Sequence, residues 1–393
     1  MTTVRPALVL WLIPFVYFVF VAAEIGALTH LMLTATEGGY SATAVGAVAT
    51  AMWAGILAAS WRAHALVARH GHARVFAAGT LLAMLALVSL ALHASLAGWI
   101  AGVVVLGIGG GLVWVAGEAW LAETAPPDRR GFFVGLFETA VGLGFMAGPM
   151  IVPLTRALAL PTLVVTACVM VAALCAAGWL LTAQRLARGA GRAPDGATRP
   201  AAWRALALPL IAIAVVSGVM ESGISALLPT IAMRLDFSFN AAAWLGAVIG
   251  AGSALLQAPI GVVADRWGVR PTTLVAWAIV IATNALLLVV AADPGRWLWA
   301  IGFALGGVGG AVYTLVIVEM GHRLSGDGLV RAVALLVIAY SIGTAAGPAL
   351  GGALFDFTGL AGLAAFMVVL SVLGLAVTAA GLRSVRQDRG GQR

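Results

Sequence analysis

The chain consists largely of apolar segments, each long enough to cross a membrane as a helix. About 20 apolar residues of α-helix span the hydrocarbon core of a bilayer, and a helix satisfies its own backbone hydrogen bonds there. The runs are continuous rather than alternating, which excludes an outer-membrane barrel. We therefore expect an all-α membrane protein with twelve transmembrane helices. The expected spans cover residues 8–33, 41–61, 75–93, 98–121, 132–155, 161–182, 205–233, 241–264, 272–292, 297–320, 332–354 and 362–382.

Composition agrees with lipid as the main solvent. Hydrophobic residues make up 62% of the chain and charged residues 9%, whereas soluble domains carry about 25% charged residues. Every basic residue is Arg, and no Lys occurs. The phosphate-binding loop of common ATPases requires Lys, so ATP is not expected to drive this protein.

The arginines predict the orientation of the chain in the membrane. With the N-terminus in the cytoplasm, 19 of the 22 fall in cytoplasmic segments, and only Arg156, Arg234 and Arg296 fall outside. Arg-rich short loops stay in the cytoplasm, so both termini are expected there. This location also accounts for the net charge of +7, and no nucleic-acid partner is expected.

Three short sequence elements occur twice, 197 to 199 residues apart, which indicates a duplicated hydrophobic unit. Internal repeats of this kind are typical of secondary transporters, whose substrate sites lie between the repeats near the midplane. The repeated pairs are Glu24-Ile25-Gly26 with Glu221-Ser222-Gly223, Ala68-Arg69-His70-Gly71 with Asp265-Arg266-Trp267-Gly268, and residues 144–149 with 343–348.

The repeat divides the chain into two six-helix bundles, residues 1–183 and 205–393, the second ending in a short cytoplasmic tail. Between them, residues 184–204 are rich in Arg, Gly, Ala and Pro, which predicts a flexible cytoplasmic linker.

The loop after the eighth span carries the pattern G-x-x-x-D-R-x-G-x-R, which resembles the loop motif of the major facilitator superfamily. The matching residues are Gly261, Asp265, Arg266, Gly268 and Arg270. The resemblance implies two pseudo-symmetric bundles in a bacterial inner membrane, alternating access, and a loop that latches the bundles on the cytoplasmic side. A monomer suffices for such a fold. Gly261 is expected to let two helices approach closely.

The first-half copy of this loop is incomplete. His64 and Ala68 replace the Gly and the Asp, and only Arg69 and Gly71 remain, so a weaker latch is expected there.

Spans five and eleven share the element G-x-x-x-G-P, which ends in Gly148-Pro149 and in Gly347-Pro348. The element resembles the superfamily's antiporter motif, and it also serves helix packing with a proline kink. Together with Trp114 and Glu118 in span four, it makes the chain similar to the YcaD-like branch, whose substrates the resemblance does not reveal.

No Arg lies inside an expected span, but five glutamates do: Glu24, Glu118, Glu138, Glu221 and Glu319. A transporter of anions usually needs a buried cation, so neutral or cationic substrates are favoured. Glu24 and Glu221 lie near the midplane, where a carboxylate is costly unless it is protonated, paired or hydrated. They are therefore the candidates for proton coupling or cation recognition.

The remaining candidates have supporting roles. Glu138 is expected to line the inner vestibule. Tyr17, Trp114 and Tyr313 are candidate cavity aromatics that can stack on a planar or cationic solute. Glu118 is expected to pair with Arg69 or Arg130, and Glu319 with Arg266 or Arg270.

The sequence thus predicts a secondary transporter of a small neutral or cationic solute, with proton-coupled efflux expected. The alternative is a symporter or facilitator that takes up a neutral nutrient such as a sugar or nucleoside. No enzymatic activity, cofactor or metal is expected, because the spans contain no nucleophile–base pair or H-E-x-x-H motif. His70 and His72 alone offer too few ligands for a specific metal site.

Overall fold

The computed structural model describes residues 6–126, 130–186, 202–323 and 326–381, and the regular structure within them is helical. The expected linker lies mostly outside the described residues, as does the tail after residue 381. The helices are α1 (Pro6–Glu37), α2 (Ala42–His70), α3 (His72–Leu92), α4 (Leu96–Thr124), α5 (Arg130–Ala157), α6 (Thr162–Leu186), α7 (Ala202–Ser225), α8 (Leu228–Arg234), α9 (Phe239–Trp267), α10 (Val269–Val289), α11 (Trp297–Ala304), the π-helix η1 (Leu305–Gly309), α12 (Gly310–Arg323) and α13 (Gly326–Gly381).

Eleven helical segments of the described chain are long and apolar enough to cross a membrane. The last, 46 residues long, is two helices joined at Gly359, where φ is +67°. Glycine adopts this backbone conformation without the penalty that a Cβ atom imposes. The two helical parts of α13, before and after Gly359, correspond to the last two expected spans. The all-helical membrane fold predicted from the sequence is confirmed.

Two expected spans are less regular than predicted. The span expected at 205–233 is interrupted after Ser225 by a turn that precedes α8. The span expected at 297–320 contains η1, whose wider turn inserts an extra residue into the helix. The first interruption precedes Pro229 at the start of α8, and the second falls in the glycine-rich segment Leu305–Gly309.

Short polar caps and glycine turns separate the helices. Ser41 and Ser238 each accept a hydrogen bond from the backbone N–H three residues later, at the start of α2 and α9. Gly71 and Gly268 connect α2 to α3 and α9 to α10 with φ of 83° and 90°. The repeated loops thus keep the same backbone turn although one has lost its Asp.

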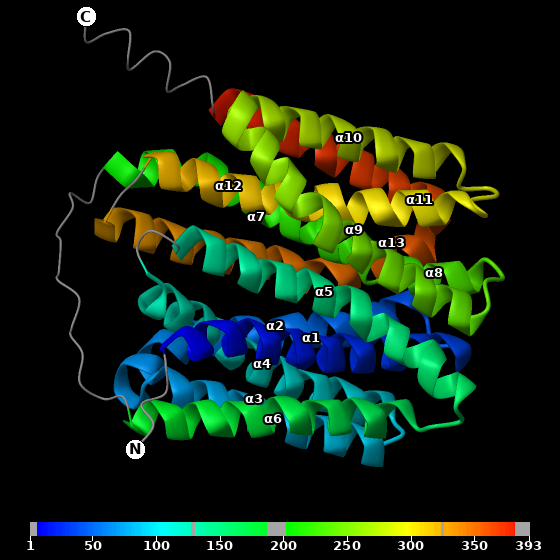
Figure 1. Cartoon of the computed structure of the whole chain (residues 1–393). Helices are drawn as coiled ribbons and strands as arrows, with labels where there is room; N and C mark the ends of the chain where they lie inside the picture. The colour runs from blue at the N-terminus through cyan, green and yellow to red at the C-terminus, as the bar shows by residue number, and fades with distance from the viewer. Residues whose placement is uncertain (1–5, 127–129, 187–201, 324–325, 382–393) are drawn as a thin grey trace, which may run out of the picture.

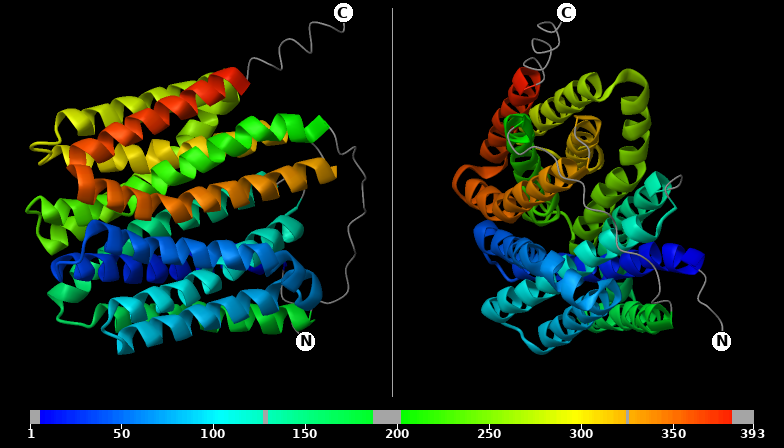
Figure 2. Two further views of the ribbon diagram at one scale, coloured as in Figure 1. Left: turned by 180° about the vertical axis from the view of Figure 1, so that it is seen from behind. Right: turned by 90° about the vertical axis from the view of Figure 1, so that its left-hand side faces the viewer.

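The helices run roughly along one direction and form two groups, α1–α6 and α7–α13 (Figure 1). The start of α1 and the end of α13 lie at the same end of the molecule, which is called here the terminal end (Figures 1 and 2). The opposite end, called the far end, carries the turns at residues 38–41, 93–95, 158–161, 235–238 and 290–296.

The two groups pack against each other through α2 with α13 and α5 with α9. Small residues allow this approach: an added Cβ atom at Gly46 would collide with the Pro348 carbonyl oxygen, and one at Gly250 with the backbone of Phe145 and Met146. All of these residues lie in the middle or toward the far end of their helices. The groups are therefore held together most closely on the far-end side.

Candidate functional site

Two glycine pairs fix the helices that carry Glu24 and Glu221. An added Cβ atom at Gly148 of α5 would lie 2.8 Å from the backbone nitrogen of Gly26, two residues after Glu24. In the second half, a Cβ atom at Gly347 of α13 would lie 2.8 Å from the backbone nitrogen of Gly223, two residues after Glu221. The repeated sequence elements are thus partners in space, and their contact sets the depth of each carboxylate.

Each carboxylate also faces a glycine in the fourth membrane span of its half, which is α4 in the first half and includes α12 in the second. A Cβ atom at Gly110 would lie 2.6 Å from Glu24 Oε1, and one at Gly310 would lie 3.1 Å from Glu221 Oε1. These glycines are 200 residues apart. The 199-residue offset that relates residues 144–149 to 343–348 would instead pair Gly110 with Gly309. The extra residue in η1 explains the shift, which also moves Tyr313 out of register with Trp114.

Glu24 occupies a small pocket in the first half. Glu24 is 5% exposed, and its Oε1 atom has no hydrogen-bond partner among the described residues. The pocket is lined mainly by apolar and aromatic side chains of α1, α2, α4 and α5, which are Tyr17, Val21, Ile25, Met52, Trp53, Ile56, Trp114, Val141 and Phe145. An ionised carboxylate in these surroundings would be unpaired, which is costly.

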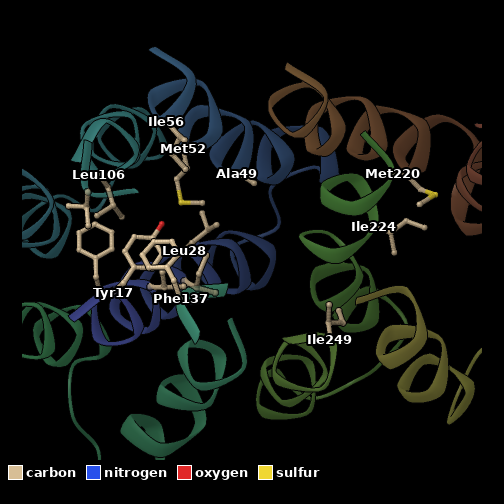
Figure 3. Close-up of a cluster of buried hydrophobic side chains, with 14 of the residues drawn as sticks. Tyr17, Leu28, Ala49, Met52, Ile56, Leu106, Phe137, Met220, Ile224 and Ile249 are labelled. Atoms are coloured by element: carbon tan, nitrogen blue, oxygen red, sulfur yellow. The ribbon is translucent and has the colours of Figure 1, made fainter. Parts of the chain in front are cut away.

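Tyr17 is part of this packed wall rather than an open stacking surface. It is 3% exposed, and its ring stacks on Phe137 with centroids 4.5 Å apart (Figure 3). Trp114 meets the Tyr17 ring edge-on at 6.4 Å and is half-buried. Of these two predicted cavity aromatics, Trp114 is therefore the more accessible.

Glu221 has a more polar environment. Tyr340 of α13 donates a hydrogen bond of 2.7 Å from its hydroxyl to Glu221 Oε2. The Tyr340 ring stacks on Tyr313 with centroids 4.0 Å apart and an interplanar angle of 23°. The amide nitrogen of Gln257 lies beside the same glycine, Gly310, as the carboxylate does.

Sequence reasoning missed Tyr340 because the repeat matches it to Val141, an apolar residue. A usable signal existed, since the chain has only four Tyr residues and this one falls within an apolar span. The structure thus makes the two halves unequal where the sequence repeat suggested equivalence.

Glu138 and Glu118 are exposed on the terminal-end side of Glu24. Trp114 lies one turn before Glu118 in α4. No ion pair joins Glu118 to Arg69 in the described structure, and the Arg130 side chain lies outside it.

The predicted loop-motif residues gather at the terminal end. Asp265, Arg266 and Gly268 are exposed there. Arg270 and Glu319 line one pocket between α7, α10, α12 and α13, which brings together the residues of one expected pair.

The expected role of Gly261 in close helix approach is not fulfilled in this conformation. Among the described residues, no atom of a neighbouring helix lies within 4 Å of a Cβ atom built on it. The physical reason is that α9 meets the first half farther along, at Gly246 and Gly250, and leaves its terminal-end part without such a neighbour.

Charged residues join the two halves at the far end. Asp356 of α13 accepts hydrogen bonds from the backbone N–H groups of Ala42 (2.9 Å) and Thr43 (2.7 Å) and from the Thr43 hydroxyl (2.6 Å). Arg234 donates to the Tyr40 carbonyl oxygen at 2.5 Å and lies 4.0 Å from Asp356. We call these five residues the far-end bridge.

A second far-end contact involves Arg156 of the first half. Its guanidinium pairs with Glu37 at 3.1 Å and lies 4.0 Å above the ring of Phe239 in the second half. Two of the three arginines that depart from the charge bias, Arg156 and Arg234, therefore contact the opposite half.

The sequence and the fold of this chain resemble those of known transporters. The sequence pattern of the Major Facilitator Superfamily matches residues 7–233 and again 210–392. The chain belongs to this superfamily. The narrower YcaD-like branch stays a prediction.

Relatives and a solved structure agree with this family. The chain is 26% identical over 318 residues to the uncharacterized MFS-type transporter YfkF of Bacillus subtilis, with 80% of each chain covered. It is 24% identical to the uncharacterized MFS-type transporter YE1530 of Yersinia enterocolitica, over 77% of this chain and 78% of that one. A mutant of the nucleoside transporter NupG has the same fold, with a TM-score of 0.72, 12% identity, and 96% and 99% coverage.

The family, the relatives and the fold identify a multi-pass membrane transporter rather than an enzyme. Members of such a family carry small molecules across the bilayer, and the embedded carboxylates are the chemical groups that distinguish this chain's interior.

Proposed function

We propose that this protein is a proton-coupled secondary transporter that exports a small neutral or cationic solute by alternating access. The observation that carries the proposal is the pair of carboxylates inside the helix bundles, the buried Glu24 and the half-buried Glu221, which face glycines at equivalent places in the two halves. Embedded carboxylates typically mark ion or substrate pathways. The absence of Arg from the expected spans disfavours an anionic substrate.

We propose further that the terminal end faces the cytoplasm of a bacterial inner membrane, as the Arg bias predicts. The far-end bridge then closes the outer side, and Glu138 and Glu118 are reached from the inside. Transport would require this bridge to open while the loop of Asp265 and Arg266 closes the inner side. A monomer is sufficient for this cycle.

Uptake of a neutral nutrient is the second candidate. The nucleoside transporter NupG shares the fold at 12% identity, and nucleosides are among the solutes that this candidate would carry. The two candidates differ in the direction of proton movement relative to the solute.

Proton flux in inside-out vesicles with an imposed pH gradient tests the proposal. A panel of lipophilic cations and neutral solutes is added, with the double variant Glu24→Gln, Glu221→Gln as control. We expect a panel member to collapse the gradient in the wild type and not in the variant. Equal collapse in a variant that remains folded would refute the glutamates' role. No response would favour uptake or facilitated diffusion.

A further inference from the structure

We propose that the two symmetry-related glutamates have different tasks: Glu221, with Tyr340 and Tyr313, binds an aromatic cation, whereas Glu24 carries the coupling proton. This proposal rests on the proposed function and names its substrate class. It follows from the difference between two environments that the sequence repeat makes equivalent.

Glu24 is placed to hold a proton rather than a bulky ligand. Its Oε1 atom is buried without a hydrogen-bond partner, and the carboxyl group abuts Gly110 so closely that even a methyl group there would collide with it. The other carboxylates inside the first half, Glu138 and Glu118, lie on the terminal-end side of Glu24 and are acidic as well. With no cation among the groups that line the pocket, a proton is the counter-charge that fits.

Glu221 is placed to remain available as an acceptor. It is only half-buried, and the Tyr340 hydroxyl stabilises one of its oxygens through a 2.7 Å hydrogen bond. Hydrogen bonds to the charged form of a carboxylate favour that form. Oε1 lies near Gly310 and the Gln257 amide, and its remaining lone pairs can accept from a ligand.

The groups around Glu221 select the class of ligand. The faces of stacked aromatic rings attract cations and flat aromatic groups. Tyr313 and Tyr340 stack on each other, so a cation would lie next to Glu221 and against an outer face of this stack, where an aromatic substituent would gain stacking area.

The exchange balances in charge. Before binding, Glu24 is protonated and neutral while Glu221 is ionised. When one monovalent cation binds at Glu221 and one proton leaves Glu24, the total charge of the two groups and their ligands is unchanged. No other co-reactant is needed.

Binding of tetraphenylphosphonium to the purified full-length protein tests this division of roles. Equilibrium dialysis from acidic to alkaline pH is compared with the binding of neutral triphenylphosphine oxide. Proton release is followed with an indicator dye in weak buffer. The exposed far-end residue Asp293 supplies a charge-matched control, Asp293→Asn.

We expect Glu221→Gln to weaken tetraphenylphosphonium binding at least about tenfold at every pH, the loss of roughly one charged contact. Tyr340→Phe should weaken it less, because the carboxylate remains. Release of the Glu24 proton on binding requires the ionised form of Glu24 to favour the cation, so the wild-type affinity should rise with pH. Glu24→Gln should keep the affinity within about threefold of the wild-type value at acidic pH, where Glu24 is protonated, and should abolish both the pH dependence and the proton release. Asp293→Asn should behave as the wild type.

Several outcomes overturn the proposal. Failure of the wild type to prefer the cation over the neutral compound refutes the ligand class. Equal loss of affinity in folded Glu24→Gln and Glu221→Gln variants refutes the division of roles. Because dialysis uses no gradient, this binding pattern without vesicle transport would refute the proposed export and leave the cation site intact.

Discussion

Replacing Asp356 by Ala is expected to loosen the far end and shift the protein away from the conformation described here. The Asp356 carboxylate accepts three hydrogen bonds from Ala42 and Thr43, at the first turn of α2. It thus acts as an N-terminal cap that comes from the other half of the molecule, and it can act only while the halves are closed at this end.

The size of the effect can be worked from these contacts. Loss of a helix N-cap costs about 0.5–2 kcal/mol, and hydrogen bonds to a charged group contribute about 1.5–3 kcal/mol. The Asp356 side chain is 21% exposed, and solvent weakens such contacts, so about 1–2 kcal/mol is expected for the whole carboxylate. That energy corresponds to about a five- to thirtyfold change in the ratio of closed to open conformers.

Spin-label distances across the far end measure this ratio. Labels at Leu158 and Phe357 suit the purpose because both side chains are exposed and belong to opposite halves. Cys168 and Cys175 are exposed and must first be replaced. Asp356→Ala should add a population with a longer distance, and Asp356→Asn, which keeps one acceptor oxygen, should add a smaller one.

Asp236→Asn is the matched control, since Asp236 is an exposed far-end acid whose positive φ of 64° Asn also tolerates. If Asp356→Ala leaves the distance distribution equal to that of this control, the carboxylate does not hold the halves together and the reasoning is wrong.

Four glycine substitutions test other parts of the structure. Gly110→Ala should abolish transport with little loss of folded protein, because its methyl group would displace the Glu24 carboxyl; unchanged transport rates would contradict the placement of that group. Gly46→Ala should open the far end in the same spin-label assay, whereas Gly261→Ala, which meets open space, should not. Gly268→Ala should lower the free energy of unfolding by about 1–2 kcal/mol, because alanine is strained at a φ of 90°; a denaturation midpoint equal to the wild type's would argue against this turn.

The sequence by itself determined the class of fold. Long apolar runs leave the backbone no alternative to helices in lipid, and the repeat indicated two similar halves. The glycine-proline elements at Gly148 and Gly347 also predicted close helix packing, although not which residues they meet. These conclusions depend on composition and period, which are properties of the chain alone.

The sequence could not determine how the two halves differ. The π-helix η1 shifts the register of the second half by one residue and packs against α9, and the glycine-rich sequence of Leu305–Gly309 did not by itself predict an extra residue there. Tyr340 is 119 residues from Glu221 along the chain, so their hydrogen bond exists only once α7 and α13 are packed together.

Tertiary structure alone also decided which end of the molecule is closed. Asp356 and Ala42 are 314 residues apart, and no sequence period connects them. At Gly261 the loop motif is complete and predicted a close approach of two helices, but in this conformation no neighbouring helix lies close to it among the described residues. Local pattern fixes which helices form and where they can touch, whereas the conformation reached depends on long-range contacts between the halves whose energies differ by only a few kcal/mol.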